Sequence, residues 1–221
     1  MCSSDLIDDL RISIKELKSE TKEMMELCEV AIEKSVDSIV NKDLDLAREV
    51  IKMDDDIDNL RNKIIEKSIE LTALKQPMAK DLRNVYALST IAMELERVGD
   101  YSVNIAMETI KIDNEEHITG MVGIPKMKSV CLNMLNAAKN ALDSNETKLA
   151  YDAALEDNIV DDLYNDVYVN LLAAMHKDSN NINQGVKLIF VARYLERIGD
   201  HITNVCENIV YAIKGDMTEL G

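Results

Sequence analysis

The chain has 221 residues, 47% of them hydrophobic, which is enough to bury the core of one large domain or two small ones. A formal net charge of -16 at pH 7 argues against nucleic acid as a partner, because that affinity comes largely from Lys and Arg, and favours cations or basic protein surfaces. Glycine and proline are scarce, with 7 and 2 residues, which predicts an all-α protein rather than a turn-rich sheet.

Three helices are expected in the first half of the chain. The first spans about residues 8–40, where apolar residues recur at helical spacing among charges. Asp43 is a suitable N-cap for a second helix that runs to about Leu74. A third helix is expected from Pro77 to about Lys111, because proline is tolerated in a first helical turn.

The second half is expected to contain three more helices after a linker without apolar periodicity. Pro125 opens the fourth helix, and the fifth follows Asn145 and runs to about Lys177. The sixth spans about 182–214 and ends at Gly215, a stop signal. These boundaries predict a first domain over 1–113, a linker over 114–125 and a second domain over 126–221.

The two halves are copies of one another. LERVGD at 95–100 returns as LERIGD at 195–200, and upstream residues match at a constant offset of 103, for example Cys28 with Cys131. Short turns between long helices favour antiparallel neighbours. The predicted fold is therefore two tandem three-helix bundles, related by internal duplication and approximate two-fold symmetry.

Each half carries two carboxylate pairs with four-residue spacing, which places both members of a pair on one helix face. In a helical hairpin, residues equidistant from the turn lie level. The midpoint of the first two pairs is Pro77, and that of the other two falls between Asp178 and Ser179, inside the predicted turns. Each hairpin should thus bring its pairs together: Asp54, Asp58, Glu96 and Asp100 in the first half, and Asp157, Asp161, Glu196 and Asp200 in the second.

Four level carboxylates repel one another, so positive charge should compensate them. Arg97 and Arg197 point about 100° away around the helix, so we expect them to be only part of the compensation. Carboxylate oxygens are hard ligands for Mg²⁺, Ca²⁺, Mn²⁺ or iron, which predicts a metal site at each cluster. The alternative is a solvated acidic face. The mid-helix Gly99 and Gly199 indicate close approach of a helix or an ion, or are relics of duplication on a tightly packed seam.

Other residues that carry chemistry form no site by spacing. Cys28, Cys131 and Cys206 lie on apolar stripes and are expected to be buried free thiols. His201, beside Asp200, is expected on the helix surface rather than as a metal ligand. The Glu-x-x-His pairs of ferritin-like di-iron enzymes are absent, as are GxSxG, P-loop and HExxH motifs, so no enzyme is predicted. A di-metal enzyme is the least favoured alternative.

Nothing in the sequence predicts insertion into a membrane. No stretch approaches the roughly 18 to 20 uncharged residues of a membrane span, and the polar start at residues 1–9 lacks the apolar region of a signal peptide. We expect a cytoplasmic protein that is peripheral to the membrane at most.

The segments QPMAKDLR at 76–83, ERVGD at 96–100 and ERIGD at 196–200 resemble the PhoU family of phosphate-uptake regulators, and the resemblance runs from about residue 17 to 214. It implies two three-helix bundles whose E/DxxxD motifs, here the eight carboxylates named above, bind multinuclear iron or another divalent metal such as Zn, Mn or Mg. It also implies a non-catalytic regulator that represses phosphate uptake and starvation signalling by contacting a phosphate ABC transporter ATPase, a sensor histidine kinase, or both. We further expect a homodimer. The alternative is a metal-free helical scaffold.

Overall fold

A computed structural model of the chain describes residues 3–113, 115–118 and 123–220, except for the side chains of residues 3–8. The described residues contain helices and no strand, which confirms the all-α prediction. Within these described residues, seven α-helices and one 3₁₀ turn follow one another: α1 Ser3–Asn41, α2 Leu44–Lys75, α3 Lys80–Ile112, α4 Gly123–Ser144, α5 Thr147–Leu155, α6 Asp157–Lys177, η1 Ser179–Asn181 and α7 Ile182–Lys214.

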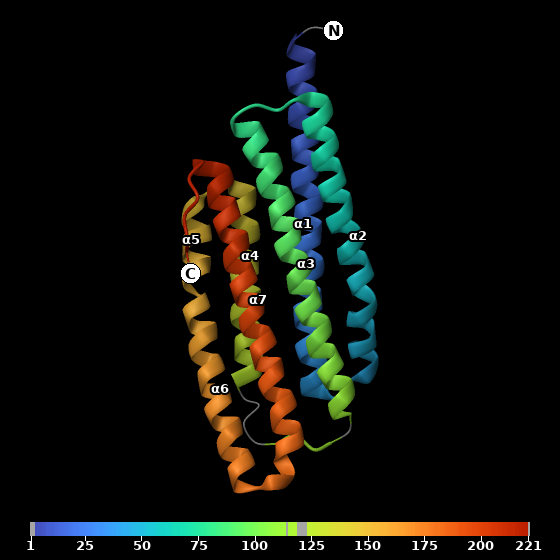
Figure 1. Cartoon of the computed structure of the whole chain (residues 1–221), viewed down its shortest axis with the longest axis vertical. Helices are drawn as coiled ribbons and strands as arrows, with labels where there is room; N and C mark the ends of the chain where they lie inside the picture. Colours follow the sequence, from blue (N-terminus) through green and yellow to red (C-terminus); the bar gives the residue numbers. More distant parts are fainter. Residues whose placement is uncertain (1–2, 114, 119–122, 221) are drawn as a thin grey trace.

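The helices lie side by side in two groups, α1–α3 and α4–α7 (Figure 1). The turn between α2 and α3 lies at one end of the molecule, and the turn between α6 and α7 lies at the other. This is the arrangement expected from two-fold symmetry about an axis across the bundle, and it confirms the two tandem bundles. The halves share one continuous apolar core, and α3 and α7 form the largest interface between helices.

Most predicted helix ends are confirmed. Asp43 caps α2, since its carboxylate accepts hydrogen bonds from the backbone N–H groups of Asp45 and Leu46 at 3.0 and 2.9 Å. Gly215 ends α7 with φ +88°, in the left-handed region that glycine enters without steric cost. The expectation that Pro77 opens the third helix is wrong. Ala79 has φ +47° and ψ -110°, outside the helical region, so α3 begins at Lys80.

The fifth predicted helix is interrupted at Glu156, between α5 and α6. The Asn158 side-chain amide donates to the Leu155 carbonyl at 3.3 Å, and the Ile159 N–H bonds to Glu156 O instead. A side-chain donor that competes for a backbone carbonyl interrupts the helical ladder. The first half has Asp55 at the equivalent position, a residue without a donor when ionised, and α2 runs through unbroken.

The cysteines follow the prediction where the structure describes them, whereas the fourth helix begins two residues earlier than expected. Helix α4 begins at Gly123, so Pro125 lies in its first turn, while residues 114 and 119–122 of the expected linker, like Cys2, lie outside the described residues. Cys28, Cys131 and Cys206 are free and buried. No helix among the described residues has both the length and the apolar character needed to cross a bilayer.

Candidate metal centres

The first predicted cluster is brought together by the α2–α3 hairpin. Asp54 and Asp58 lie on α2, and Glu96 and Asp100 lie on α3. Burial raises the pKa of Asp54, and the negative charges of Asp100, Asp58 and Glu96 raise it further. The pKa of Glu96 is raised by burial and by Asp100, against the lowering effect of Arg97 and Arg61. The four carboxyl groups therefore share one electrostatic environment.

The second cluster lies on α6 and α7, and like charges act strongly on Asp157 there. Burial, followed by the charges of Asp200, Asp161 and Glu196, raises the pKa of Asp157 to about 7. Burial and the Asp200 charge also raise the pKa values of Asp161 and Glu196. The helix break places Asp157 at the first residue of α6, where the helix dipole favours a negative charge but does not cancel this repulsion.

The motif glycines make room for the facing aspartates. A Cβ atom on Gly199 would lie 2.3 Å from Asp157 Oδ1, and one on Gly99 would lie 3.7 Å from Asp54 Oδ1 and 3.1 Å from Ile57 Cδ1. The expected close approach of a neighbouring helix at these glycines is confirmed. The approach is tighter in the second cluster, where the space that glycine leaves open is filled by a carboxylate oxygen.

Arginines reach the clusters, which corrects the expectation that they point away. Arg97 Nη1 donates to Asp100 Oδ2 and Arg197 Nη1 to Asp200 Oδ2, each at 3.0 Å. A long side chain bridges to the residue three positions along the same helix, so the direction of its Cα–Cβ bond alone does not decide its partner.

Sequence reasoning missed two further arginines. Arg61 Nη2 lies 3.3 Å from Glu96 Oε1 and 3.6 Å from Asp58 Oδ1. Arg193, which lies 5.8 Å from the centroid of the Tyr164 ring, donates to Glu196. In the alignment of the two copies, Arg61 corresponds to Tyr164, and Arg193 corresponds to Met93. Each cluster therefore has one extra arginine, which comes from the first helix of the hairpin (α2) in the first cluster and from the second helix (α7) in the second cluster. Arg61 follows Asp58 by three residues and Arg193 precedes Glu196 by three, a spacing that could have indicated both ion pairs from the sequence.

The second cluster fits a cation in its donor chemistry. Asp157 Oδ1 and Glu196 Oε2 are buried and accept no hydrogen bond of normal geometry among the described residues. Thr203 is near enough to offset part of the rise that burial causes in the pKa of Asp157, and Arg197 Nε lies 3.7 Å from Glu196 Oε2. Buried acceptors normally have a partner, and carboxylate oxygens are the ligands that hard cations prefer. In the conformation described, no three His, Cys, Asp or Glu side chains within the described ranges converge so as to hold an ion. A metal would therefore require the carboxylate side chains to rearrange, and its binding by the eight carboxylates stays a prediction.

His201 joins the two halves of the molecule. Its Nδ1 lies 2.8 Å from Glu94 Oε2 on α3, which also accepts a hydrogen bond from Asn204 at 3.0 Å. Burial acts to raise the pKa of Glu94, but the bonds from His201 and Asn204 outweigh it and lower the pKa overall. His201 is thus half-buried in an inter-repeat contact, rather than simply on the surface as expected.

Substituting Asp157→Asn should stabilise the metal-free protein above neutral pH. The folded protein keeps a proton on Asp157 up to about pH 7, whereas the unfolded chain loses it near the ordinary value of 3.8. The folded state thus binds more protons across that window, and this group makes the free energy of unfolding fall as pH rises. Asp157 is only half-buried, so we expect an effect on the order of 1 kcal/mol, or about 2–4 °C in Tm at pH 8, and none near pH 3.5.

Differential scanning calorimetry in the presence of chelator would measure both pH values. Asp152→Asn, which removes an exposed carboxylate from α5, is the matched control and should leave Tm unchanged. An equal shift of Tm by Asp157→Asn at both pH values would contradict a titration of Asp157.

The chain resembles proteins of one family along nearly its whole length. The model of the PhoU domain matches it twice, over residues 21–109 and 124–209. The phosphate-specific transport system accessory protein PhoU homolog of Clostridium acetobutylicum is 35% identical over 208 residues, which are 94% of this chain and 95% of that protein. The homolog from Pseudomonas aeruginosa is 30% identical and matches over 94% of this chain and 87% of that protein.

Solved structures agree with this relationship. The crystal structure of PhoU from Pseudomonas aeruginosa matches with a TM-score of 0.89 and 29% identity, over 93% of this chain and 99% of that one. The crystal structure of the phosphate transport system regulatory protein PhoU from Streptococcus pneumoniae matches with a TM-score of 0.89 and 25% identity, over 96% of this chain and 100% of that one. The double domain match coincides with the two halves seen in the fold.

Proposed function

The chain belongs to the PhoU family, and from this premise we propose that it is an accessory regulator of phosphate transport that acts by protein contact and not by catalysis. Its relatives are named accessory proteins of phosphate-specific transport systems, and the chain spans nearly their full length. The partner that we propose is the cytoplasmic ATPase of a phosphate ABC transporter, with a sensor histidine kinase as a second partner. Contact would repress uptake and starvation signalling.

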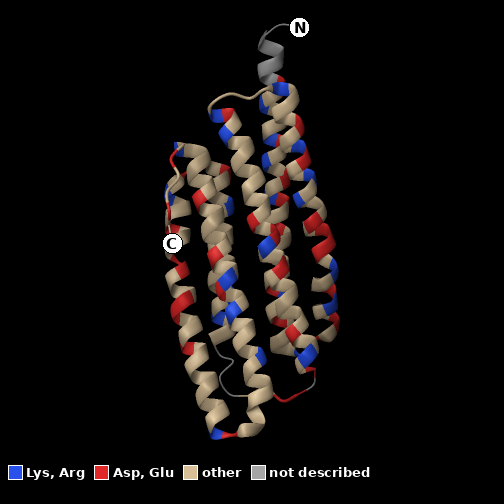
Figure 2. Ribbon diagram, in the orientation of Figure 1, with Lys and Arg blue, Asp and Glu red and all other residues tan. Residues whose placement is uncertain are grey.

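The observation that carries this proposal is an exposed apolar surface at the end of each hairpin. We call residues 69–86 of the α2–α3 hairpin the first tip, and residues 168–190 of the α6–α7 hairpin the second tip. Met78 is 80% exposed and Leu74 69% exposed in the first tip, and Val169 is 62% and Phe190 49% exposed in the second. The ribbon of the second tip is almost free of charged residues, in a chain that is otherwise rich in them (Figure 2). Exposed apolar patches of this kind mark protein contacts.

The internal duplication repeats this surface. The apolar residues Ile69, Leu82 and Tyr86 of the first tip match Leu172, Ile182 and Val186 of the second, and all six are exposed. The first tip also contains part of a groove of about 440 Å³ between α2 and α3. The protein thus has two similar apolar surfaces at opposite ends (Figure 1). One tip suits the transporter, and the other suits the second copy in the homodimer that we also propose.

The carboxylate clusters would set the geometry of these tips. Each cluster joins the two helices of the hairpin whose end forms a tip, and Tyr86 precedes Glu96 by ten residues, or about 15 Å along α3. A metal ion bound by both helices would neutralise their repulsion and fix their relative positions. We therefore propose metal binding by the eight carboxylates, with iron or another divalent metal such as Zn, Mn or Mg as the ion.

The test is a charged substitution in the second tip. Val186→Asp together with Phe190→Asp should weaken binding to the detergent-solubilised phosphate ABC transporter at least tenfold, or about 1.4 kcal/mol, because two apolar anchors become charged. In cells that lack their own copy of the protein, the same variant should fail to restore repression of phosphate uptake. Surface plasmon resonance and phosphate-uptake assays would measure the two effects.

The matched control adds the same charge to polar positions of the same hairpin. Asn180→Asp with Asn183→Asp, both at exposed positions, should leave affinity and repression unchanged. Parent-like affinity in the Val186 and Phe190 variant would exclude the second tip as the transporter contact. A change from dimer to monomer in sedimentation velocity, with affinity for the transporter retained, would assign this tip to a second copy of the chain instead.

A further inference from the structure

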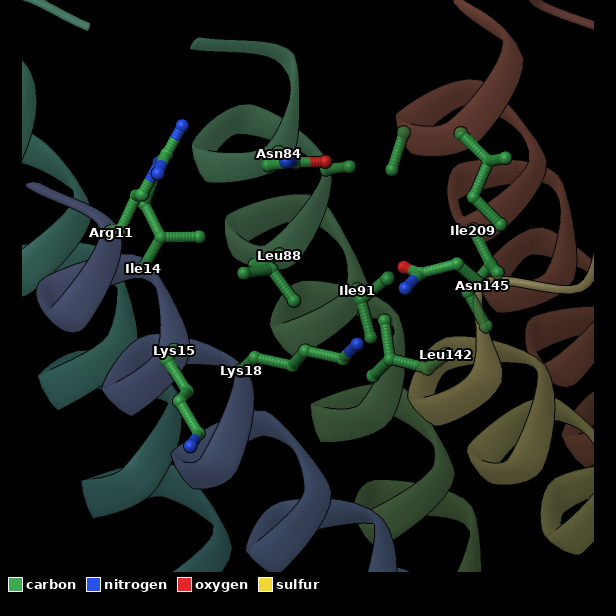
Figure 3. Close-up of a pocket in the computed structure, with 13 residues that line it drawn as sticks. Arg11, Ile14, Lys15, Lys18, Asn84, Leu88, Ile91, Leu142, Asn145 and Ile209 are labelled. Carbon is green, nitrogen blue, oxygen red and sulfur yellow. The ribbon is translucent and has the colours of Figure 1, made fainter. Parts of the chain in front are cut away.

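A pocket of about 270 Å³ lies at the junction of the two halves, away from both carboxylate clusters and from the second tip. Among the described residues that line it, Asn84 alone belongs to the first tip. Its walls come from α1, α3, the end of α4 with the turn that follows, and the end of α7 (Figure 3). Segments from both halves of the chain therefore meet around one small space.

The floor of the pocket is apolar. Leu88 and Ile91 of α3, Leu142 of α4, and Ile209 and Ala212 of α7 line it, and all five are buried parts of the core. Side chains of this kind offer a bound molecule no hydrogen bond, so the part of a ligand that enters furthest must itself be apolar.

The rim, as far as the structure describes it, carries more positive than negative charge. Arg11, Lys15 and Lys18 of α1 line the pocket, and no Asp or Glu is among the described residues that do so, although the chain has 41 acidic and 25 basic residues. Among the side chains that the structure describes, which do not include those of residues 3–8, no carboxylate pairs with Arg11 or Lys15. Asn84 and Asn145 add side-chain amides. The rim is thus suited to an anion.

Lys18 connects the rim with the floor. Its side chain lies across the pocket toward Ile91, and the Asn145 carboxamide lies on the far side (Figure 3). Its ammonium donates to the Asp143 carbonyl at 3.3 Å, and burial lowers its pKa although Asp143 acts to raise it. A cation held partly away from water beside apolar groups gains from an anionic partner.

We propose that this pocket binds a small amphiphilic anion, with its apolar body on the floor and one phosphate or carboxylate head between Lys15, Lys18 and Arg11. Inorganic phosphate would leave the floor empty, and a neutral amphiphile would leave the cations without a partner. Both a free anion, such as a short acyl phosphate or fatty acid, and an anionic membrane lipid have this chemistry. Because the ligand would touch both halves, its binding would stabilise their junction.

Isothermal titration calorimetry with monomeric decyl phosphate tests the site on the full chain. One molecule should bind per chain, at least tenfold more tightly than inorganic phosphate or decyl maltoside. Lys15→Gln with Lys18→Gln should weaken the binding at least tenfold, the loss expected when charge-assisted contacts worth about 1.4 kcal/mol are removed. Lys52→Gln with Lys148→Gln, which removes two exposed lysines of α2 and α5, is the matched control and should bind like the parent.

A second variant tests the floor, and vesicles separate the two sources. Ala212→Leu places a larger side chain in the pocket and should also weaken decyl phosphate binding, with an unchanged circular dichroism spectrum as the check on folding. If the parent protein sediments with phosphatidylglycerol vesicles and the Ala212→Leu variant does not, the ligand is a membrane lipid and the pocket is supported. Binding of decyl phosphate without sedimentation would identify a free anion and support it equally.

Three outcomes would overturn the proposal. The first is no binding of decyl phosphate to the parent protein. The second is equal affinity for inorganic phosphate and decyl phosphate. The third is sedimentation with vesicles that is lost in the lysine variant but kept in Ala212→Leu, because attraction by the rim alone needs no pocket. Since none of the substituted residues belongs to a cluster or a tip, failure here leaves the proposed function untouched.

Discussion

Elemental analysis of untagged protein purified without chelator is expected to find bound metal, which is lost when the α3 and α7 carboxylates become amides. The variant carries Glu96→Gln, Asp100→Asn, Glu196→Gln and Asp200→Asn. Neutral amides remove both the charge and the hard oxygen donors that a divalent ion needs, so metal content should fall to background. Asp100→Ala and Asp200→Ala alone should each remove about half of it, since the structure separates the clusters into two hairpins.

The chain offers a matched control for this variant. Glu66 with Glu70 on α2, and Asp162 with Asp166 on α6, are exposed acids at the same four-residue spacing. Changing these four to amides alters the net charge equally but should leave the metal content intact. The second cluster, which holds two buried oxygens without a hydrogen bond, should also keep its metal longer against a chelator. A parent protein that holds no metal, and cannot be loaded with iron, manganese, zinc or magnesium, would favour the helical scaffold.

Removing the metal is expected to weaken binding to the phosphate ABC transporter at least tenfold. Without a cation, like charges on α2 and α3, and on α6 and α7, repel at the level of the clusters, as the raised pKa values of Asp54 and Asp157 indicate. The two helices of each hairpin would then be held less firmly relative to one another at the tip. Ordering them on binding would cost free energy and weaken the affinity. Surface plasmon resonance with metal-loaded and chelated protein measures the difference.

The amide variant gives this experiment a second readout. Its α3 and α7 positions no longer carry charge, so chelator should change its affinity for the transporter by less than about twofold, within the spread expected for a surface change. Equal affinity of loaded and chelated parent protein would disconnect the metal from partner binding. The apolar tips would then act on their own, and the clusters would need another role.

The duplication and the level of the carboxylates were readable from the sequence because both depend on local spacing. Residues related by the 100- and 103-residue offsets make equivalent contacts in the two halves. Cys28 Sγ donates to Leu95 O at 3.3 Å, and Cys131 Sγ donates to Leu195 O at 3.5 Å. Equal distance from the hairpin turn brought Asp54 toward Asp100 as expected. These features follow from the helical period and from chain connectivity, which hold wherever a helix forms.

Features that depend on side-chain rotamers could not be decided from sequence spacing alone. The helix break at Glu156 is accompanied by a hydrogen bond from the Asn158 side chain to the Leu155 carbonyl. The arginine partners of Glu96 and Glu196 depend on rotamers and on the rotation of each helix about its axis. Sequence spacing limits these choices without deciding between them.

Helical periodicity and turn residues were enough to predict the all-α class, the repeat, the two hairpin turns and the height of eight carboxylates. They could not predict that Asp157 Oδ1 is buried without a hydrogen bond, that His201 contacts Glu94 across the halves, or that Lys18 and Ile209 line one pocket. The difference lies in the distance along the chain over which each effect acts. Periodicity and capping act within a few residues, whereas burial and long-range contacts are set by the packing of α3 against α7, whose contacting residues are about 100 positions apart.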